Sequence, residues 1–277
     1  MTVLVDGIPG EGSIPAGDGA VLRGDGCFEV LHAYGGRAFE LDAHLQRLES
    51  SAEMLRIELP PRATIGQWVE RAAREAGDGA VRIVVTRGGS IPGWDVPSQV
   101  LVFPHELPPA PDRLKLRPVR APWHAAGEAW ELAGAKTLSY APNQAATRLA
   151  VSEGFDDALL ISRRGELLEG PTFSVAWVVD GRLETPALDL GILDSITRRL
   201  VLSDARSEGI EVVEDSFEEA RLSQAAEVIA MSTVKEVSPV RAVGEISFDV
   251  GPVTKTLAEA FGRRTQLTAS QAAAGDG

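Results

Sequence analysis

A proline-rich stretch at residues 107–112, Leu-Pro-Pro-Ala-Pro-Asp, divides the chain into two halves, because proline continues neither a helix nor the interior of a sheet. Each half alternates between runs typical of strands and runs with helical periodicity. In the first half we expect strands at 28–32, 37–41, 81–86 and 99–104. Two helices are expected between them, one that Asp42 caps and one at about 65–76.

The second half repeats this alternation. Strands are expected at 114–121, 158–162, 174–179 and 226–231, and helices at 142–153, 194–208 and 253–261. The pattern predicts a mixed α and β protein of two domains. We expect a small N-terminal domain at 1–115, a connection at 116–125, a large domain at 126–265 and a flexible tail at 266–277.

Composition argues against several classes of protein. A net charge of −13, from 27 basic and 40 acidic residues, does not suit a protein that grips nucleic acid by its phosphates. No apolar run approaches the ~20 residues of a membrane-spanning helix, and the first residues do not resemble a secretory signal. The one cysteine, Cys27, suits a reducing cytoplasm. The four histidines lack metal-ligand spacing, so no metal site is expected.

Two charged residues stand out in otherwise apolar or turn-like surroundings. Lys136 is the only charged residue between Glu131 and Arg148. If it is buried, its amine becomes nucleophilic and suits Schiff-base chemistry, whereas a surface lysine needs no such role. Glu169 stands in a turn just before a strand, where it is either a half-buried carboxylate or a plain turn residue.

Three further segments carry groups that suit a phosphate. Ser195 and Thr197 open a helix, which offers free backbone N–H groups and hydroxyls, although a plain N-cap would look the same. Ser232 and Thr233 end a strand with two adjacent hydroxyls. Arg47, on the first long helix, is either a fixed positive charge for an anion or an exposed helix arginine.

In this order the segments resemble the fold-type IV (class IV) pyridoxal-phosphate (PLP) enzymes, over about residues 3–262. That family includes branched-chain aminotransferases, D-amino-acid transaminases and aminodeoxychorismate lyases. The resemblance rests on Arg23-Gly-Asp-Gly-Cys-Phe-Glu-Val30, His44-Leu-Gln-Arg47-Leu48, Ala135-Lys136-Thr with Tyr140, Gly154-Phe-Asp-Asp-Ala158, Glu169-Gly170, Thr185-Pro186, Ile196-Thr197-Arg198, Ser232-Thr233-x-x-Glu236-Val-Ser-Pro-Val240 and Gly251-Pro-Val-Thr-Lys255. It implies a small N-terminal α/β domain and a larger C-terminal pseudo-barrel domain, with PLP in the cleft between them.

The resemblance also implies a role for each matching residue. Lys136 would form a Schiff base with PLP and then move the substrate α-proton. Glu169 would pair with the protonated pyridine nitrogen, and Tyr140 would hydrogen-bond the phenolate oxygen of the cofactor. The residues implied at the phosphate are Arg47, Ser195, Ile196, Thr197, Ser232 and Thr233.

The chain departs from the family pattern at the substrate. Of the tyrosine, arginine and histidine with which D-amino-acid transaminases hold the substrate carboxylate, only the arginine has a match, Arg87; Phe28 stands at the tyrosine position. The arginine of branched-chain enzymes matches Arg82. Both remain candidates for the carboxylate, with a strand-end salt bridge as the alternative. Trp123 and His124 are assigned to a loop near the substrate, with a packed or exposed connector as the alternative. Ser174 stands where the family often has Asn, and Ser195 where it commonly has Gly.

The resemblance therefore predicts a PLP-dependent aminotransferase that takes an amino donor and a keto-acid acceptor, as a homodimer. A second enzymatic possibility is 4-amino-4-deoxychorismate lyase, which releases p-aminobenzoate and pyruvate with the same cofactor. A third is a PLP-binding or interaction protein without catalysis, because a fold alone does not fix a function.

Overall fold

The computed structural model describes residues 1–89, 91–93, 95–109 and 111–275. By their internal contacts, the residues form two compact units. The first unit contains Met1–Pro108, Ala135–Tyr140 and Arg264–Gly277, and the second contains Pro109–Gly134 and Ala141–Arg263. The mixed α and β character that the sequence predicts is present in both units.

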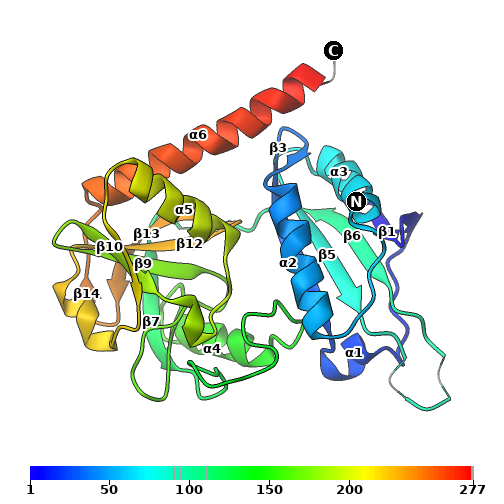
Figure 1. The fold of residues 1–277 in the computed structure, drawn as a ribbon, viewed down its shortest axis with the longest axis horizontal. Coiled ribbons are helices and arrows are strands. Elements are labelled where there is room, and N and C mark those ends of the chain that lie inside the picture. Colours follow the sequence, from blue (N-terminus) through cyan, green and yellow to red (C-terminus); the bar gives the residue numbers. More distant parts are fainter. Residues whose placement is uncertain (90, 94, 110, 276–277) are drawn as a thin grey trace. The chain divides into compact units, whose positions relative to one another are not determined.

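The first unit is built on a six-stranded antiparallel sheet with the order β2-β1-β6-β5-β3-β4 (Figure 1). Its elements are β1 (Val3–Val5), β2 (Ile8–Gly10), α1 (Gly19–Arg23), β3 (Gly26–Tyr34), β4 (Arg37–Ala38), α2 (Leu41–Met54), α3 (Arg62–Ala76), β5 (Ala80–Thr86) and β6 (Val100–His105). Leu45 and Leu48 of α2 and Val69 of α3 pack with Leu31 and Ile83 of the sheet to form its core. Both long helices therefore bury their apolar stripes on the sheet.

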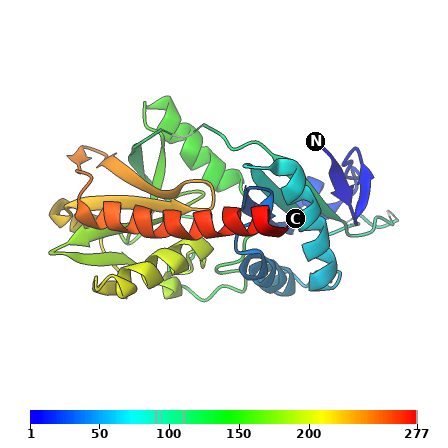
Figure 2. The same ribbon diagram turned by 90° about the horizontal axis from the view of Figure 1, so that it is seen from above.

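The second unit is built on an eight-stranded mixed sheet with the order β11-β10-β9-β12-β13-β7-β8, and β14 pairs with β13. Its elements are β7 (Leu114–Arg120), α4 (Ala141–Ser152), β8 (Asp157–Ile161), β9 (Ser174–Val179), β10 (Arg182–Pro186), α5 (Ile196–Ser207), β11 (Val212–Asp215), β12 (Glu227–Ser232), β13 (Glu236–Val243) and β14 (Ile246–Ser247), with short 3-10 helices at Leu188–Leu190 and Glu219–Gln224. Helix α4 packs on β7 and β8 at one end of this sheet, and α5 packs on β12 and on β11 at the other end (Figures 1 and 2). Trp177 of β9 is fully buried in the core.

Several expectations from the sequence need correction. Asp42 is not the N-cap of α2, because the helix begins at Leu41 after Glu40, whose φ of 53° is left-handed and whose side chain makes no capping bond. The elements not expected from the sequence include α1, β10, β11, β13 and β14. The strand expected at 37–41 is only β4 (Arg37–Ala38), because α2 already begins at Leu41. The last helix, expected at 253–261, is α6 (Pro252–Gly275), so most of the segment expected as a tail is helical, and 276–277 lie outside the described residues.

The grouping of residues also differs from the expected domain bounds. β7 belongs to the second unit because it pairs in parallel with both β13 and β8. Residues 135–140, expected in the large domain, belong to the first unit because they pair with β3. In the part of the chain that the structure describes, no helix is long and apolar enough to cross a membrane, and no three His, Cys, Asp or Glu side chains gather as metal ligands.

Candidate functional site

Lys136 lies at the edge of the sheet in the first unit. Thr137 forms an antiparallel bridge with Cys27. The backbone N–H of Phe28 donates to the carbonyl of Lys136 at 3.1 Å, and that of Leu138 donates to Gly26 at 2.8 Å. The segment therefore extends the sheet beside the first half of β3, where β4 does not reach.

The segment at 136–138 and strand β5 lie so close to position 26 that only a glycine fits there. A Cβ on Gly26 would lie 2.3 Å from the carbonyl oxygen of Val85 and 2.7 Å from Cδ1 of Leu138. A second contact fixes the lysine from the helical side, since its backbone N–H donates to Oγ of Ser51 on α2 at 3.1 Å. The main chain of Lys136 is thus held by both the sheet and α2.

The side chain of Lys136 lies among aromatic rings. Its Nζ is 4.4 Å from the ring centroid of Phe28 and 5.9 Å from that of Tyr140. The two rings meet edge to face at 5.2 Å. Lys136, Phe28 and Tyr140, all predicted for the cofactor or substrate, are therefore neighbours within the first unit.

Arg82 is the second cation at this aromatic cluster. It lies on β5 opposite Val30, and because Val84 pairs with Phe28, strand alternation places Arg82 and Phe28 on the same face of the sheet. Its guanidinium carbon is 5.5 Å from the Phe28 ring centroid. Burial lowers the pKa of Arg82, and the neighbouring Tyr140 partly opposes that effect. A guanidinium on the same ring as the lysine amine suits a carboxylate ligand.

On the helix-covered face of the same sheet, Arg47 is held by a buried carboxylate. Glu29 of β3 is fully buried, and it accepts from Nε and Nη2 of Arg47 at 2.7 and 2.8 Å. His44 lies one turn before Arg47 on α2, and its Nδ1 is 2.8 Å from Oε2 of Glu29. The sequence analysis named Arg47 but missed Glu29 and His44, although a glutamate inside an apolar strand was a usable signal.

The electrostatics of this group favour an ionised glutamate and a neutral histidine. Burial raises the pKa of Glu29, but the charge of Arg47 and the hydrogen bonds from Arg47 and His44 outweigh it and hold that pKa far below its usual range. Burial lowers the pKa of His44 despite the opposing effect of Glu29. Neutral His44 therefore donates its Nδ1 proton to the carboxylate.

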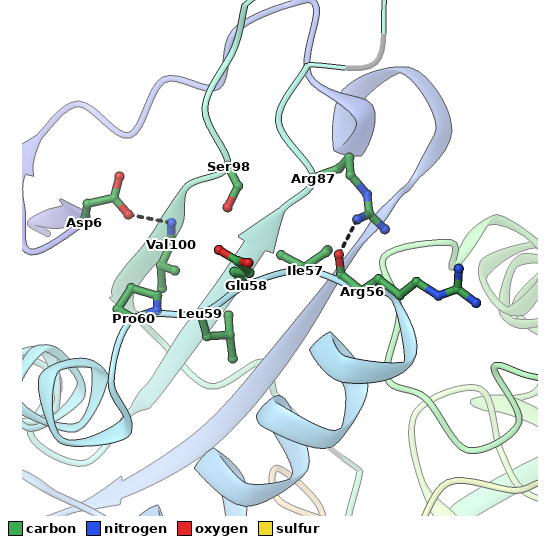
Figure 3. A pocket seen from close by; sticks show the side chains of 9 residues that line it. All are labelled: Asp6, Arg56, Ile57, Glu58, Leu59, Pro60, Arg87, Ser98 and Val100. Carbon is green, nitrogen blue, oxygen red and sulfur yellow. Dashed lines mark hydrogen bonds between the residues drawn. The ribbon is translucent and has the colours of Figure 1, made fainter.

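Arg87 does not join the cluster around Lys136. Its Nε and Nη2 each donate to the carboxylate of Asp25 at 3.0 Å, and it also donates to the carbonyls of Leu55 and Arg56. It borders a pocket of about 450 Å³ in the first unit (Figure 3). The pocket is lined by Asp6, Arg56, Ile57, Glu58, Leu59, Pro60, Arg87, Ser98 and Val100. The four hydrogen bonds that Arg87 donates to Asp25, Leu55 and Arg56 favour a strand-end salt bridge over a substrate role.

In the second unit, Glu169 lies in the loop between β8 and β9. Both of its carboxylate oxygens accept the backbone N–H of Leu193, at 3.3 and 3.2 Å. Nε2 of His124 lies 3.8 Å from Oε1 of Glu169. Nδ1 of His124 accepts the N–H of Ala126 at 3.2 Å, which leaves Nε2 facing the carboxylate.

Trp123 is tied to the same part of the second unit. Its indole N–H donates to Oδ1 of Asn143 at 3.0 Å, and Nδ2 of Asn143 donates to the carbonyl of Pro171. Pro171 follows Glu169 by two residues. The loop that carries Trp123 and His124 therefore lies against the Glu169 loop.

The N-terminus of α5 offers donors for an anion. Ser195 is the N-cap, with φ −71° and ψ 128°, and its Oγ accepts the N–H of Arg198 at 3.2 Å. This extended backbone suits any residue, so a serine fits where the family commonly has glycine. Ile196 and Thr197 form the first turn, whose backbone N–H groups lack helical partners, and Thr197 is buried.

Arg198 connects this helix start to the end of β10. It is 1% exposed, and its Nη2 donates to the carbonyl of Pro186 and to Glu214, both at 2.8 Å. Its Nε lies 3.4 Å from Oγ1 of Thr185. The contact gives a structural reason for the Thr185-Pro186 and Ile196-Thr197-Arg198 motifs, which the sequence alone left without one.

Ser232 and Thr233 lie where β12 turns into β13. Oγ of Ser232 accepts the N–H of Lys235 at 3.0 Å, which stabilises the turn. Next to this strand, Ser174 begins β9 and pairs with Met231. Within the described part of the chain, its buried Oγ has no hydrogen-bond partner. The second unit thus carries Glu169 and the hydroxyl groups predicted for the phosphate, whereas the first carries Arg47, Lys136 and Tyr140.

The chain is similar to known proteins over most of its length. A family model described as amino-transferase class IV matches residues 26–243. The chain is 32% identical over 259 residues to a putative branched-chain-amino-acid aminotransferase from Methanocaldococcus jannaschii, covering 88% of each chain. It is 33% identical over 237 residues to a bifunctional aminodeoxychorismate lyase / D-amino acid transaminase from Mycobacterium tuberculosis, covering 76% of this chain and 80% of that one.

A solved structure has the same fold. It is that of a hypothetical aminotransferase from Mycobacterium tuberculosis, in a form with α-ketoglutarate and PMP bound. The TM-score is 0.87 at 27% sequence identity, over 96% of this chain and 99% of that chain. The likeness therefore covers both units.

Proposed function

The chain belongs to the class IV aminotransferase family, and on that premise we propose that it is a PLP-dependent transaminase. It would move an amino group between an amino acid or primary amine and a 2-keto acid. The observation that carries the proposal is the position of Lys136, whose amine lies against Phe28 and Tyr140 with the cationic Arg82 on the same ring. A relative with transaminase activity in its name and a structure with a bound keto acid support the same reaction.

The residues of the chain fit PLP in their chemistry. The cofactor needs an amine, a carboxylate for its pyridine nitrogen and donors for its phosphate, and Lys136, Glu169 and Arg47 are of these types. The first turn of α5 adds backbone N–H groups and Thr197. Ser195 and Ser232 each accept a backbone N–H, so their own hydroxyl protons can donate to phosphate oxygens, as can Thr233.

When bound, PLP supplies an electron sink that makes the C–H bond beside the substrate nitrogen acidic. The Nζ of Lys136 would take that proton and return it during the transfer of the amino group. Glu169 would keep a proton on the pyridine nitrogen, because an ionised carboxylate stabilises the neighbouring cation. Tyr140 would donate to the phenolate oxygen, and the ring of Phe28 would exclude water from the lysine amine.

Arg82 is our candidate for the substrate carboxylate, and Arg87 is not, because the carboxylate of Asp25 and two carbonyls already engage Arg87. Replacement Arg82→Gln is expected to raise the KM for a keto-acid acceptor at least tenfold while the protein stays folded. Arg87→Gln is the matched control, and it is expected to lower the melting temperature with little change in KM. The opposite pattern would reassign the carboxylate to Arg87.

The transaminase is tested by a donor panel on the PLP-loaded protein: L- and D-branched-chain amino acids, D-alanine, D-glutamate and (R)-1-phenylethylamine. Conversion of bound PLP to pyridoxamine phosphate is followed by absorbance. We expect at least one donor to convert the wild type but not Lys136→Ala. Lys115→Ala is a matched control, because Nζ of Lys115 also lies over a ring, Phe155 at 4.2 Å, in the second unit.

The bifunctional relative gives a specific reason to retain a second candidate, aminodeoxychorismate lyase. That reaction needs no keto-acid acceptor. Pyruvate released from aminodeoxychorismate, with no conversion by any donor, would replace the transaminase by the lyase. PLP that stays spectrally unchanged with every substrate would instead leave a PLP-binding protein without catalysis.

The assembly and location proposed for the chain follow the family resemblance and the composition. We propose a homodimer, to be tested by light scattering of the PLP-loaded protein; a monomeric mass would contradict it. A cytoplasmic location is proposed because the one cysteine, Cys27, is buried and forms no disulfide.

A further inference from the structure

We propose that Glu29 is a positioning residue for the cofactor phosphate, which acts by holding the guanidinium of Arg47 in one orientation, with His44 holding the carboxylate in turn. The inference rests on the proposed function, since it gives the Glu29–His44–Arg47 group a role toward the phosphate of PLP. Neither Glu29 nor His44 would touch the cofactor itself.

The geometry of the ion pair fixes the orientation of Arg47. Glu29 binds the Nε–Nη2 edge of the guanidinium through two hydrogen bonds of 2.7 and 2.8 Å. A guanidinium is planar and rigid, so this side-on contact turns the Nη1–Nη2 edge away from Glu29. Such an edge binds two oxygens of a phosphate, and an arginine held in advance loses less side-chain entropy when it does so.

Helix α2 links this orientation to the lysine. His44, Arg47 and Ser51 are three and four residues apart, so they share one face of the helix. His44 binds Glu29, and Ser51 accepts the backbone N–H of Lys136. The helix therefore fixes the spacing between the arginine proposed for the phosphate and the lysine proposed for the aldehyde carbon of the same cofactor.

The arrangement requires an ionised carboxylate at position 29, and Arg47 and His44 stabilise that charge against the cost of burial. Glu29 is fully buried and His44 is 1% exposed, and the Arg47 side chain is 10% exposed. The charge of Arg47 acts on both Glu29 and His44, and Lys136 acts on His44. A neutral replacement at position 29 would leave the guanidinium without its anion and would place an amide N–H against an arginine N–H.

The test measures the affinity of the apoprotein for PLP and for pyridoxal, which lacks the phosphate. In the wild type, PLP should bind much more tightly than pyridoxal. Glu29→Gln should weaken PLP binding about tenfold to a hundredfold, the range found when groups that orient a ligating side chain are removed, and should leave pyridoxal binding nearly unchanged. A purely structural role would weaken both ligands together.

A second buried glutamate provides a matched control. Glu184 of β10 is 2% exposed, accepts from Nε and Nη2 of Arg221 at 2.8 and 2.6 Å, and accepts the ring N–H of Trp177 at 2.9 Å. This arrangement resembles that of Glu29 in its two-bond contact with one arginine and its ring N–H donor, although Arg182 also lies 3.7 Å from Glu184, and none of its residues is assigned to the cofactor. Glu184→Gln should lower stability and leave the ratio of PLP to pyridoxal affinity unchanged.

A double-mutant cycle tests whether Glu29 acts through Arg47. Once Arg47→Lys has removed the planar guanidinium, Glu29→Gln should cause little further loss of PLP affinity. Additive losses in the double variant would overturn the inference. If the Gln variant does not fold, Glu29→Asp keeps the charge but retracts the carboxylate, and the same selective loss of PLP affinity is expected.

An unchanged ratio of PLP to pyridoxal affinity in the folded Glu29 variants would overturn the inference and leave the proposed function intact. A wild-type protein that does not prefer PLP to pyridoxal would refute the phosphate assignments of the proposed function, and this inference with them.

Discussion

Replacement of Arg198 by methionine should destabilise the protein, and the matched change at Arg206 should not. Both arginines bind the carboxylate of Glu214, Arg198 through Oε2 at 2.8 Å and Arg206 through Oε1 at 2.7 Å. They differ in exposure, since Arg198 is 1% exposed and Arg206 is 54% exposed. The two variants therefore compare a buried arginine with an exposed one that binds the same carboxylate.

The magnitude follows from what each variant leaves behind. Without Arg198, the carbonyl of Pro186 loses its donor in a buried place, which costs about 1–3 kcal/mol. Glu214 is a third exposed and keeps its ion pair with Arg206, so the loss of its ion pair with Arg198 adds only about 0.5–1 kcal/mol. Burial of an uncharged side chain recovers part of this, so we expect a net loss of about 2–3 kcal/mol. Arg206→Met should cost about 0–1 kcal/mol.

Thermal unfolding of the apoproteins measures the difference. At about 2–4 °C per kcal/mol, Arg198→Met should lower the melting temperature by about 4–12 °C and Arg206→Met by about 0–4 °C. Since Arg198 fixes the first turn of α5 to Pro186, PLP affinity should fall in the first variant only. Equal melting temperatures for the two variants would refute the reasoning that burial decides the value of these contacts.

Three further predictions concern the rest of the molecule. Glu227→Ala should cost about 2–4 kcal/mol, because its buried carboxylate caps α6 by accepting the N–H groups of Val253 and Thr254, and denaturant unfolding that shows less than about 1 kcal/mol would contradict that role. The thiol of Cys27 should not react with Ellman's reagent until the protein unfolds, because burial, helped by Glu29, raises its pKa to about 12; stoichiometric reaction of the native protein would disprove this. Folding lowers the pKa of Glu29 from its ordinary 4.5, so the ionised carboxylate stabilises the protein above about pH 4.5 and this stabilisation is lost as the pH falls further. The difference in unfolding free energy between the wild type and Glu29→Gln should therefore shrink on acidification below that pH. A difference that stays constant would argue against an ionised Glu29.

The elements that the sequence predicted well are those with strong local patterns. β5, β9 and α3 lie within a few residues of their expected bounds, because apolar alternation and helical periodicity act over neighbouring residues. β13 was missed because its polar and apolar residues do not alternate regularly. The end of α6 was placed too early because the small and polar residues from Thr268 onward resemble a tail, although alanine favours helices.

The sequence by itself determined the order of the motifs, the class IV resemblance and the residue types suited to PLP, because each of these is a property of residues close together in the chain. Only the tertiary structure decided that Lys136 lies on the edge of β3, that Arg87 is engaged by Asp25 while Arg82 lies beside Phe28, and that Glu29 holds Arg47. These pairs are far apart in sequence. Strand register and helix packing bring them together, and their burial sets the charges on which the proposed chemistry depends.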